Sequence, residues 1–187
     1  TAEICLDALK TAKKLGVKTS CDLNFRKNLW TSEKAGKVMG ELMTYVDLCI
    51  ANEEDADKVF GIKAASTDVE TGKLDREGYN VAKQLCERFG CSSIAITLRE
   101  SITANDNNWA AMLYSGGECY FSKKYAVHIV DRVGGGDSFG AGLIYSLVNG
   151  KSPADAIEFA TAASCLKHTI EGDFNRVTVD EVNALVK

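Results

Sequence analysis

The stretch DRVGGGDSFGAG, residues 131–142, places three consecutive glycines directly before an aspartate and then resumes a helix-compatible pattern. Inside a regular element each glycine would cost roughly 0.5–1 kcal/mol relative to alanine, so a segment that has three of them needs bare backbone. Amides at the N-terminus of a helix point outward and carry about half a positive charge, which makes them an anion site. We therefore expect Gly134, Gly135 and Gly136 to open a helix whose amides bind an anion.

The aspartate that follows these glycines, Asp137, lies in the first turn of the expected helix. Its carboxylate has two interpretations. In the first, it complements the helix dipole, which is worth roughly 0.3–1 kcal/mol. In the second, it accepts a proton from an alcohol held beside the anion site and acts as a catalytic base.

Two glycine fingerprints of nucleotide-binding proteins do not fit this chain. The P-loop pattern would need a glycine at Tyr145, ahead of the triplet GKS at 150–152, and that triplet falls between two expected helices. The dinucleotide pattern, started at Gly134, would need a glycine at Phe139. The glycine run therefore belongs to another kind of anion site.

The composition describes one globular domain whose partner is a small molecule. The 187 residues are 45% hydrophobic, enough to bury roughly 70% of the unfolded surface. A formal charge of −4 argues against nucleic acid or a membrane surface as a partner. No run reaches 18 apolar residues, and residues 1–16 lack the pattern of a signal peptide. Seven cysteines without a C-x-x-C spacing favour free thiols, so we expect a cytoplasmic protein.

Segments with helical and strand periodicity alternate along the chain, which predicts an α/β fold with a parallel sheet covered by helices. Two strand-like runs flank Gly116–Gly117, a pair typical of a tight hairpin, so the sheet also has an antiparallel edge. The polar segment 63–75 lacks apolar periodicity and is expected to be a surface loop. We expect helices over 2–15, 32–45, 53–60, 75–89, 137–149 and 153–168 and from Thr178, and strands over 17–25, 46–52, 92–98, 109–115 and 118–122.

Residues 131–142 resemble the C-terminal signature of the PfkB (ribokinase-like) carbohydrate kinases, written D-T-x-G-A-G-D-x-F-x-x-G. Arg132 stands where threonine is usual, and Gly135 stands where alanine is usual. We therefore expect Gly135→Ala to be a mild change. The resemblance implies that Asp137 is the catalytic base and that the amides of 134–137 form an anion hole for the γ-phosphoryl group of ATP.

The same resemblance implies a fold, a ribokinase-like three-layer αβα sandwich whose sheet is mostly parallel with an antiparallel edge hairpin. It also implies that residues 1–187 are the C-terminal, nucleotide-binding portion of a single kinase domain. The N-terminal part and the lid of the family are not recognisable in the sequence. We therefore expect the chain to be a fragment of a longer protein, and a homo-oligomer formed through the missing lid stays open.

Three shorter stretches resemble elements with which the family binds nucleotide and magnesium. Asn52 and Asp55 match an N-x-x-E element that supports magnesium and phosphate, with Asp55 in place of glutamate; an acidic helix cap is the alternative. Thr97 matches the nucleotide-binding T-L-G stretch, in which Arg99 replaces the glycine. Thr161 lies where the helix beside the adenine more commonly has asparagine, and a packing face of small residues is the alternative.

Asp22, Asn24 and Arg26 form a D-x-N-x-R element that, together with the glycine stretch, is most similar to the 2-keto-3-deoxygluconate kinases of this family. Arg26 follows a predicted strand, where open α/β sheets bind ligands. Its guanidinium can pair bidentately with a carboxylate, which neutral sugars lack. Asp173 resembles the position that reaches back to the sugar in the acid-sugar kinases. Fructokinase-like relatives share the D-x-N-x-R element, so a kinase of the fructokinase or ribokinase type stays open.

The reaction implied by the resemblance is in-line transfer of the γ-phosphoryl group of ATP, assisted by Mg²⁺, to a primary hydroxyl of a sugar acid. The expected partners are then the sugar acid and ATP, with no nucleic acid and no membrane. A non-catalytic nucleotide-binding module is the alternative, because the implied sugar pocket and lid belong in large part to the portion that is not recognisable here.

Overall fold

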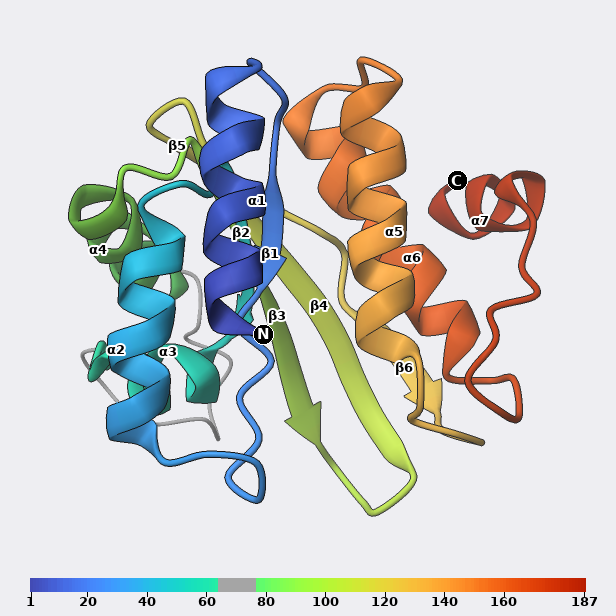
Figure 1. The fold of residues 1–187 in the computed structure, drawn as a ribbon. Helices are drawn as coiled ribbons and strands as arrows, with labels where there is room; N and C mark the ends of the chain where they lie inside the picture. The colour runs from blue at the N-terminus through green and yellow to red at the C-terminus, as the bar shows by residue number, and fades with distance from the viewer. Residues whose placement is uncertain (64–76) are drawn as a thin grey trace. The chain divides into compact units, whose positions relative to one another are not determined.

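A computed structural model describes residues 1–63 and 77–187 of the chain (Figure 1). The predicted surface loop over 63–75 lies, apart from Lys63, outside the described residues. The elements are, in chain order, α1 (Ala2–Lys14), β1 (Ser20–Asp22), α2 (Ser32–Met43), β2 (Leu48–Asn52), α3 (Glu53–Phe60), α4 (Glu77–Phe89), β3 (Ser93–Ser101), β4 (Asp106–Ser115), β5 (Glu118–Phe121), β6 (Tyr125–His128), α5 (Gly135–Val148), α6 (Pro153–Lys167) and α7 (Val179–Val186).

The strands form one mixed sheet in the order β1-β2-β3-β4-β5, with β6 paired to β4. β1 and β2 are parallel, with Cys21 opposite Cys49, whereas β4 and β6 are antiparallel. The predicted hairpin at Gly116–Gly117 is the turn between β4 and β5, and both glycines have positive φ, +62° and +88°. Such a turn follows the right-handed twist of its strands. The α/β prediction and the antiparallel edge are therefore confirmed.

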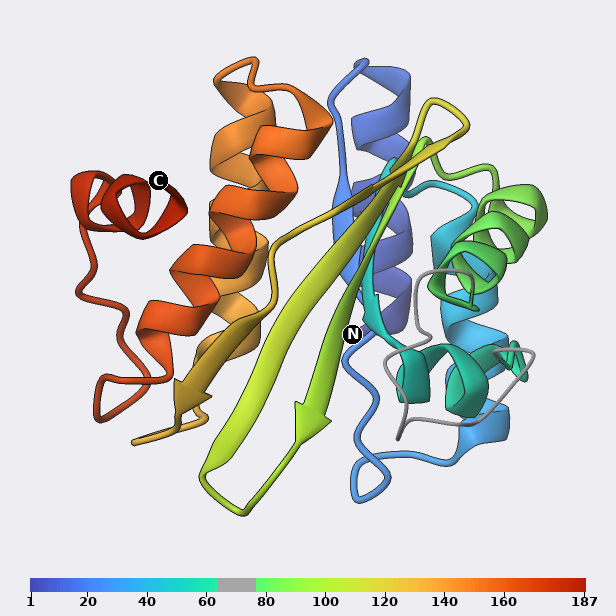
Figure 2. The ribbon, with the colours of Figure 1, turned by 180° about the vertical axis from the view of Figure 1, so that it is seen from behind.

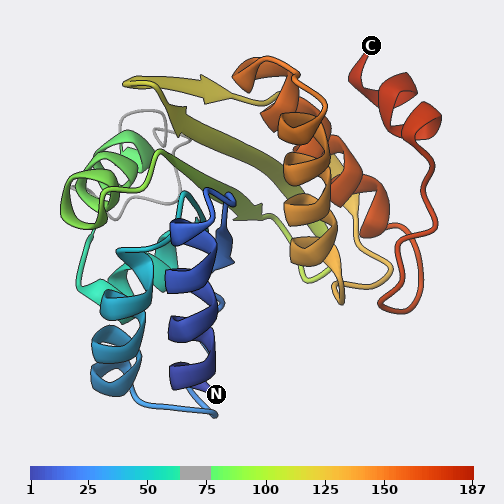
Figure 3. The ribbon, with the colours of Figure 1, turned by 45° about the horizontal axis from the view of Figure 1, so that its top comes forward.

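The chain divides into two compact units, of which the first comprises residues 1–96 and 114–118. Its helices α1 and α2 lie side by side (Figures 1 and 3). α2 turns Ala35, Met39 and Met43 into the core of this unit. Four of the five residues of β2 are buried, as expected for a strand that is covered on both faces.

The second unit comprises residues 97–113 and 119–187 and is built on the pair α5 and α6 (Figure 2). A Cβ added at Gly142 of α5 would lie 3.1 Å from the Cα of Ala160 in α6, so a glycine allows this close approach. α6 begins at the predicted cap, Ser152, followed by Pro153. α7 begins at Thr178 with the predicted capping box and packs on α6 through the cluster Phe159, Ala162, Ala163 and Val182.

The structure corrects several predicted boundaries. β1 is far shorter than the strand predicted over 17–25. Its C-terminal end falls before Asn24, whose φ of +40° an extended strand cannot accommodate. α5 begins two residues before the predicted start, since Gly134 supplies a left-handed N-cap. β6 was not predicted, because its four residues carry too short a pattern and it is defined by its pairing with β4.

The cysteines are free thiols, as predicted, but only some of them are core residues. Cys49, Cys91 and Cys165 are buried, and burial is the main reason that the pKa of the Cys91 thiol is raised to about 12. Cys5 is exposed. Among the described residues no group of three or more His, Cys, Asp or Glu side chains could hold a metal ion.

Two glycines of α2 provide a matched test of the packing in the first unit. A Cβ added at Gly36 would lie 2.6 Å from the backbone oxygen of Val59 in α3, whereas one added at Gly40 meets nothing within 4 Å. We expect Gly36→Ala to lower the free energy of unfolding by about 1–3 kcal/mol, the usual cost of overpacking. We expect Gly40→Ala to raise it by roughly 0.5–1 kcal/mol, because alanine favours the helix.

The measurement is urea unfolding of both variants and the wild type at one temperature. Equal effects of the two substitutions would contradict the close contact between α2 and α3.

Candidate active site

The glycine run forms the N-terminus of α5, and this N-terminus has no side-chain cap. Gly134 is the N-cap residue, with φ +77° and no side-chain hydrogen bond. By contrast, α2, α3, α6 and α7 each begin with a side-chain oxygen that accepts an amide hydrogen bond. The first backbone bond of the α5 ladder runs from the Ser138 amide to the Gly134 carbonyl, at 2.9 Å. The amides of Gly136 and Asp137 precede it and have no acceptor within the helix, so they are available to an anion.

Asp137 is the third residue of α5, and its side chain is exposed beside these amides. An exposed carboxylate next to an anion site has the position required of a base that acts on a hydroxyl beside a phosphate. Nothing in the contacts of Asp137 distinguishes this role from a purely electrostatic one, so the catalytic role stays a prediction.

The loop after α6 packs against the glycine run. A Cβ on Gly134 would lie 2.2 Å from the backbone oxygen of Asp173, so both the space and the positive φ at 134 require glycine. The amide of Gly172 donates to the Asp131 carboxylate at 2.9 Å, and the amides of Val130 and Asp131 donate to the His168 carbonyl. The structure thereby brings the backbone of Asp173 next to the loop that bears Asp137.

Two residues at the end of α6, Ser164 and His168, contact Gly135. Ser164 donates its hydroxyl to the Gly135 carbonyl at 2.8 Å. The ring of His168 is buried, lies with its Nδ1 2.7 Å from the Ser164 carbonyl, and packs on Trp109 with ring centroids 4.8 Å apart. Burial, assisted by neighbouring cationic side chains, lowers the pKa of His168 below its ordinary value. A neutral imidazole therefore fills the space beneath the glycine run.

Three of the predicted nucleotide residues lie in the same unit as the glycine run. Thr97 is half-buried in β3, and Arg99 is exposed two residues further along that strand. Thr161 is fully buried in α6, and its hydroxyl donates to the Ile157 carbonyl at 2.8 Å. These contacts assign Thr161 to helix packing, so its part in nucleotide binding stays a prediction.

The D-x-N-x-R element lies in the first unit and forms a turn at the carboxyl end of β1. The amide of Asn24 donates to the Asp22 carboxylate at 3.1 Å, and Asn24 has positive φ. Arg26 follows this turn with an exposed side chain, one nitrogen of which donates to the Phe25 carbonyl at 3.2 Å. The turn thus aims Arg26 away from the core, at the edge of the sheet where α/β proteins bind ligands.

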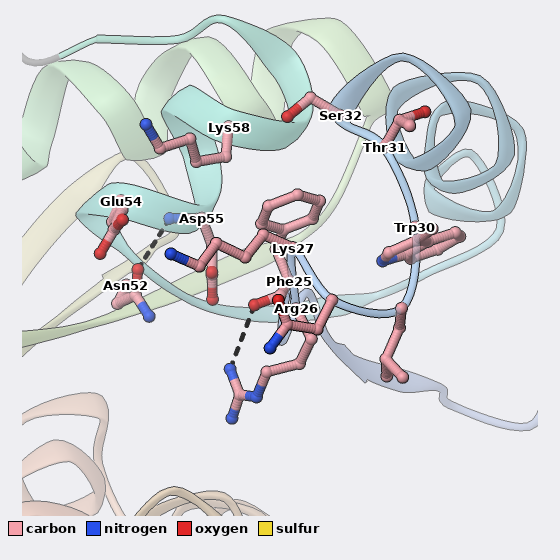
Figure 4. Close-up of a pocket in the computed structure, with 12 residues that line it drawn as sticks. Phe25, Arg26, Lys27, Trp30, Thr31, Ser32, Asn52, Glu54, Asp55 and Lys58 are labelled. Carbon is pink, nitrogen blue, oxygen red and sulfur yellow. Dashed lines mark hydrogen bonds between the residues drawn. The ribbon is translucent and has the colours of Figure 1, made fainter.

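A pocket of about 750 Å³ adjoins this element (Figure 4). Asn52 caps α3 through its side-chain oxygen, which accepts the Asp55 amide at 2.7 Å. Asp55 is buried, and its pKa is raised to about 6, mainly by burial and secondly by the Asp22 carboxylate. A backbone hydrogen bond from Phe25 and the charge of Arg26 act in the opposite direction. The pocket is lined by Phe25, Arg26, Lys27, Asn28, Leu29, Trp30, Thr31, Ser32, Asn52, Glu54, Asp55 and Lys58.

The predicted site residues are divided between the two units. The roles assigned to these residues stay predictions. The first unit holds Asp22, Asn24, Arg26, Asn52 and Asp55, and the second holds Thr97, Arg99, Gly134, Gly135, Gly136, Asp137, Thr161 and Asp173.

The sequence did not lead us to predict the residues that pack against the glycine run. Ser164, Lys167 and His168 are polar residues spaced three and four apart in an otherwise apolar part of α6, and such spacing places side chains on one helix face. This spacing was the available signal. A polar stripe within a buried helix indicates a polar partner, which here is the loop that starts at Asp131.

The sequence pattern that defines the pfkB family carbohydrate kinases matches residues 1–176, a span that includes both site elements. The chain belongs to the pfkB family of carbohydrate kinases. The family resemblance of the glycine run is thereby confirmed.

Individual relatives in the pfkB family refine this picture. A 2-dehydro-3-deoxygluconokinase from Thermotoga maritima, known from a crystal structure, is 46% identical in sequence and has a TM-score of 0.93. The match covers 99% of this chain and 55% of that protein. A 2-dehydro-3-deoxygalactonokinase of Haloferax volcanii is 28% identical over 181 residues, 97% of this chain and 51% of the relative. A putative ribokinase II from E. coli, solved with ATP and Mg²⁺, is 20% identical in sequence and has a TM-score of 0.72. The match covers 96% of this chain and 51% of that protein, and it shows a shared fold.

These likenesses confirm the ribokinase-like fold. The pfkB chain described here spans about half the length of the relatives that it matches. Among its described residues, no helix has the length and apolar character needed to span a bilayer.

The packing beneath the glycine run contradicts the expectation that Gly135→Ala is mild. A Cβ at Gly135 would lie 2.7 Å from two atoms of the His168 ring, whereas one at Gly136 meets nothing within 4 Å. Because the ring is held by Ser164 and Trp109, we expect Gly135→Ala to lower the free energy of unfolding by about 1–3 kcal/mol. We expect Gly136→Ala to change it little.

The control is the pair of substitutions Gly135→Ala and His168→Ala in one protein, because removal of the ring makes room for the methyl group. Urea unfolding of the single and double variants gives the coupling energy. Additive effects would show that the ring does not meet residue 135.

Proposed function

We propose that this chain is the catalytic and nucleotide-binding part of a kinase that transfers the γ-phosphoryl group of ATP to a primary hydroxyl of 2-keto-3-deoxygluconate. The observation that carries the proposal is the exposed Asp137 carboxylate on the first turn of a helix whose glycine N-terminus has no side-chain cap. Membership of the pfkB family supports the use of ATP and a carbohydrate. Because the chain covers about half of its relatives, the activity belongs to the full-length protein.

In the proposed reaction Asp137 takes the proton of the sugar hydroxyl while that oxygen attacks the γ-phosphorus. The bond between the γ-phosphorus and the oxygen that bridges it to the β-phosphate breaks, and ADP leaves with the electron pair. A positioned base typically contributes 10²–10⁴-fold. The amides of Gly136 and Asp137 are fixed donors for the negative charge on the transferred group, and such preorganised donors are strongly stabilising where water is excluded.

Magnesium is implied by the family, and oxygen donors of the type that it prefers are present in the first unit. Mg²⁺ is usually held by one or two carboxylates together with waters and substrate phosphates. The Asp55 carboxyl fits this description, and the Asn52 amide beside it orients the first turn of α3. When bound, the ion would neutralise charge on the phosphates.

The sugar acid is proposed from Arg26. Its guanidinium is exposed after β1 and uses one nitrogen on the Phe25 carbonyl, which leaves other donors for a carboxylate. The relatives named above are kinases of a 2-dehydro-3-deoxygluconate and a 2-dehydro-3-deoxygalactonate. Both substrates carry a carboxylate, whereas fructose and ribose have none, so a bidentate arginine would discriminate between the two classes.

The first test is Asp137→Asn in the full-length protein. The amide keeps the shape of the side chain but accepts no proton, so we expect kcat to fall by at least about 10²-fold with little change in stability. Steady-state kinetics with ATP and 2-keto-3-deoxygluconate measure it. The control is Asp180→Asn, which changes another acidic residue in the first turn of a helix and should leave turnover unchanged. Near-normal turnover in Asp137→Asn would remove this residue from the mechanism.

The second test is Arg26→Lys, which decides the substrate class. A lysine cannot reproduce the planar two-point contact with a carboxylate. We expect kcat/KM for 2-keto-3-deoxygluconate to fall by an amount equivalent to about 1.5–3 kcal/mol, the range for hydrogen bonds to charged groups. Residual activity on fructose and ribose should be almost insensitive to the change.

The comparison uses all three substrates with the wild type and the variant. If fructose is the better substrate of the wild type, or if all three substrates lose equally, a kinase of the fructokinase or ribokinase type replaces the sugar-acid kinase. If no sugar is phosphorylated, a non-catalytic nucleotide-binding module replaces the enzyme.

A further inference from the structure

The last residue of α6, Lys167, is a charged side chain with no exposed surface. Its Nζ donates to the Ile170 carbonyl at 3.0 Å. Among the described residues no carboxylate lies within salt-bridge distance of it. Burial of an ammonium group is costly unless other groups compensate the charge. A methionine would fill the same space without that cost, so filling the space does not by itself account for a lysine here.

Lys167 lies directly beneath the glycine run. A Cβ on Gly134 would be 3.3 Å from the Cε of Lys167. The same Cβ would also meet the backbone oxygen of Asp173. The stem of the lysine therefore packs on the N-cap of α5, while its ammonium holds the start of the loop over 170–173. The Gly172 amide of the same loop donates to Asp131, in the segment that leads into the glycine run.

The surroundings suit a positive charge. Lys167 ends α6, where the helix dipole favours a cation. The pKa of the Asp131 carboxyl lies below its ordinary value, chiefly because the amides of Val133 and Gly172 donate to it, and the charge of Lys167 adds to this effect. The field of the lysine therefore reaches the segment that leads into the anion site.

We propose that Lys167 is a positioning residue for phosphoryl transfer, whose buried ammonium fixes the glycine run against the loop over 170–173 and adds a permanent positive charge beneath the anion hole. The inference rests on the proposed function, because it assigns the anion hole to the transferred phosphoryl group. The ammonium of Lys167 adds a full positive charge to the partial positive charges of the amides in the anion hole. A purely structural lysine would be replaceable by any residue that fills the space, and this difference makes the proposal testable.

The decisive variant is Lys167→Met in the full-length protein, since methionine is unbranched, of similar length and uncharged. We expect kcat to fall by roughly 10- to 100-fold, the scale on which small displacements of reacting groups act. KM for the sugar acid should change little, because Arg26 and its turn belong to the first unit. The control Lys124→Met removes an exposed lysine that pairs with Glu100 and should leave kcat unchanged. Wild-type kcat in Lys167→Met would overturn the proposal.

A second variant separates charge from packing. Lys167→Ala leaves a space that a small amine can enter, so methylammonium or ethylammonium should restore part of its kcat, whereas sodium at the same ionic strength should not. The same amines should not affect the wild type. Loss of kcat without rescue by either amine would overturn the role of the charge and leave Lys167 a packing residue.

Binding provides a readout that does not depend on turnover. ATP should raise the melting temperature of the wild type more than that of Lys167→Met, because a ligand that binds the folded state stabilises it in proportion to its affinity. Equal shifts would contradict a charge at the anion site. If wild-type protein shifts with ATP but phosphorylates no sugar, the proposed function fails while the role of Lys167 in anion binding is still measured.

Should both variants fail to fold, the wild type labelled with ¹⁵N-lysine gives the answer. The proposal requires one buried lysine nitrogen with the shift of an ammonium group at neutral pH and a response to added ATP. The shift of a neutral amine, or no response to ATP, would overturn it.

Discussion

The close approach of the Asp173 backbone oxygen to Gly134 is the constraint on which the site depends. No side chain fits between them, and the positive φ at Gly134 would strain any residue other than glycine. This contact joins the loop after α6 to the start of α5. The Gly172 amide, which donates to Asp131, fastens the same two segments at a second point. Ser164 of α6 bonds to the Gly135 carbonyl of α5, and Lys167 ties α6 to its own following loop.

The consequence for chemistry is that the first turn of α5 is held by its surroundings rather than by a cap. A capping side chain would satisfy the amides and remove them from any ligand. Here the Gly135 carbonyl accepts a hydrogen bond from Ser164, while no side chain caps the amides of the first turn. The family to which the chain belongs uses phosphate donors, and an open set of amides is suited to receive them.

Local signals in the sequence predicted the parts of the fold that depend on local chemistry. Ser152 before Pro153, the capping box at Thr178 and the paired glycines of the hairpin all specify their own backbone geometry. The glycine run was recognised because its pattern is continuous in sequence. β6, in contrast, exists through its pairing with β4, and the roles of Lys167 and His168 arise from a loop more than thirty residues away. Single-sequence periodicity carries no such information.

The ring of His168 beneath Gly135 also restricts the order in which this protein can change over evolutionary time. The methyl group of an alanine at 135 and the imidazole at 168 compete for one volume. A lineage that exchanges glycine for alanine at 135 therefore loses less stability if it first acquires a smaller residue at 168. Among relatives, histidine at 168 should accompany glycine at 135, so the two columns of an alignment should covary although the residues lie on different helices.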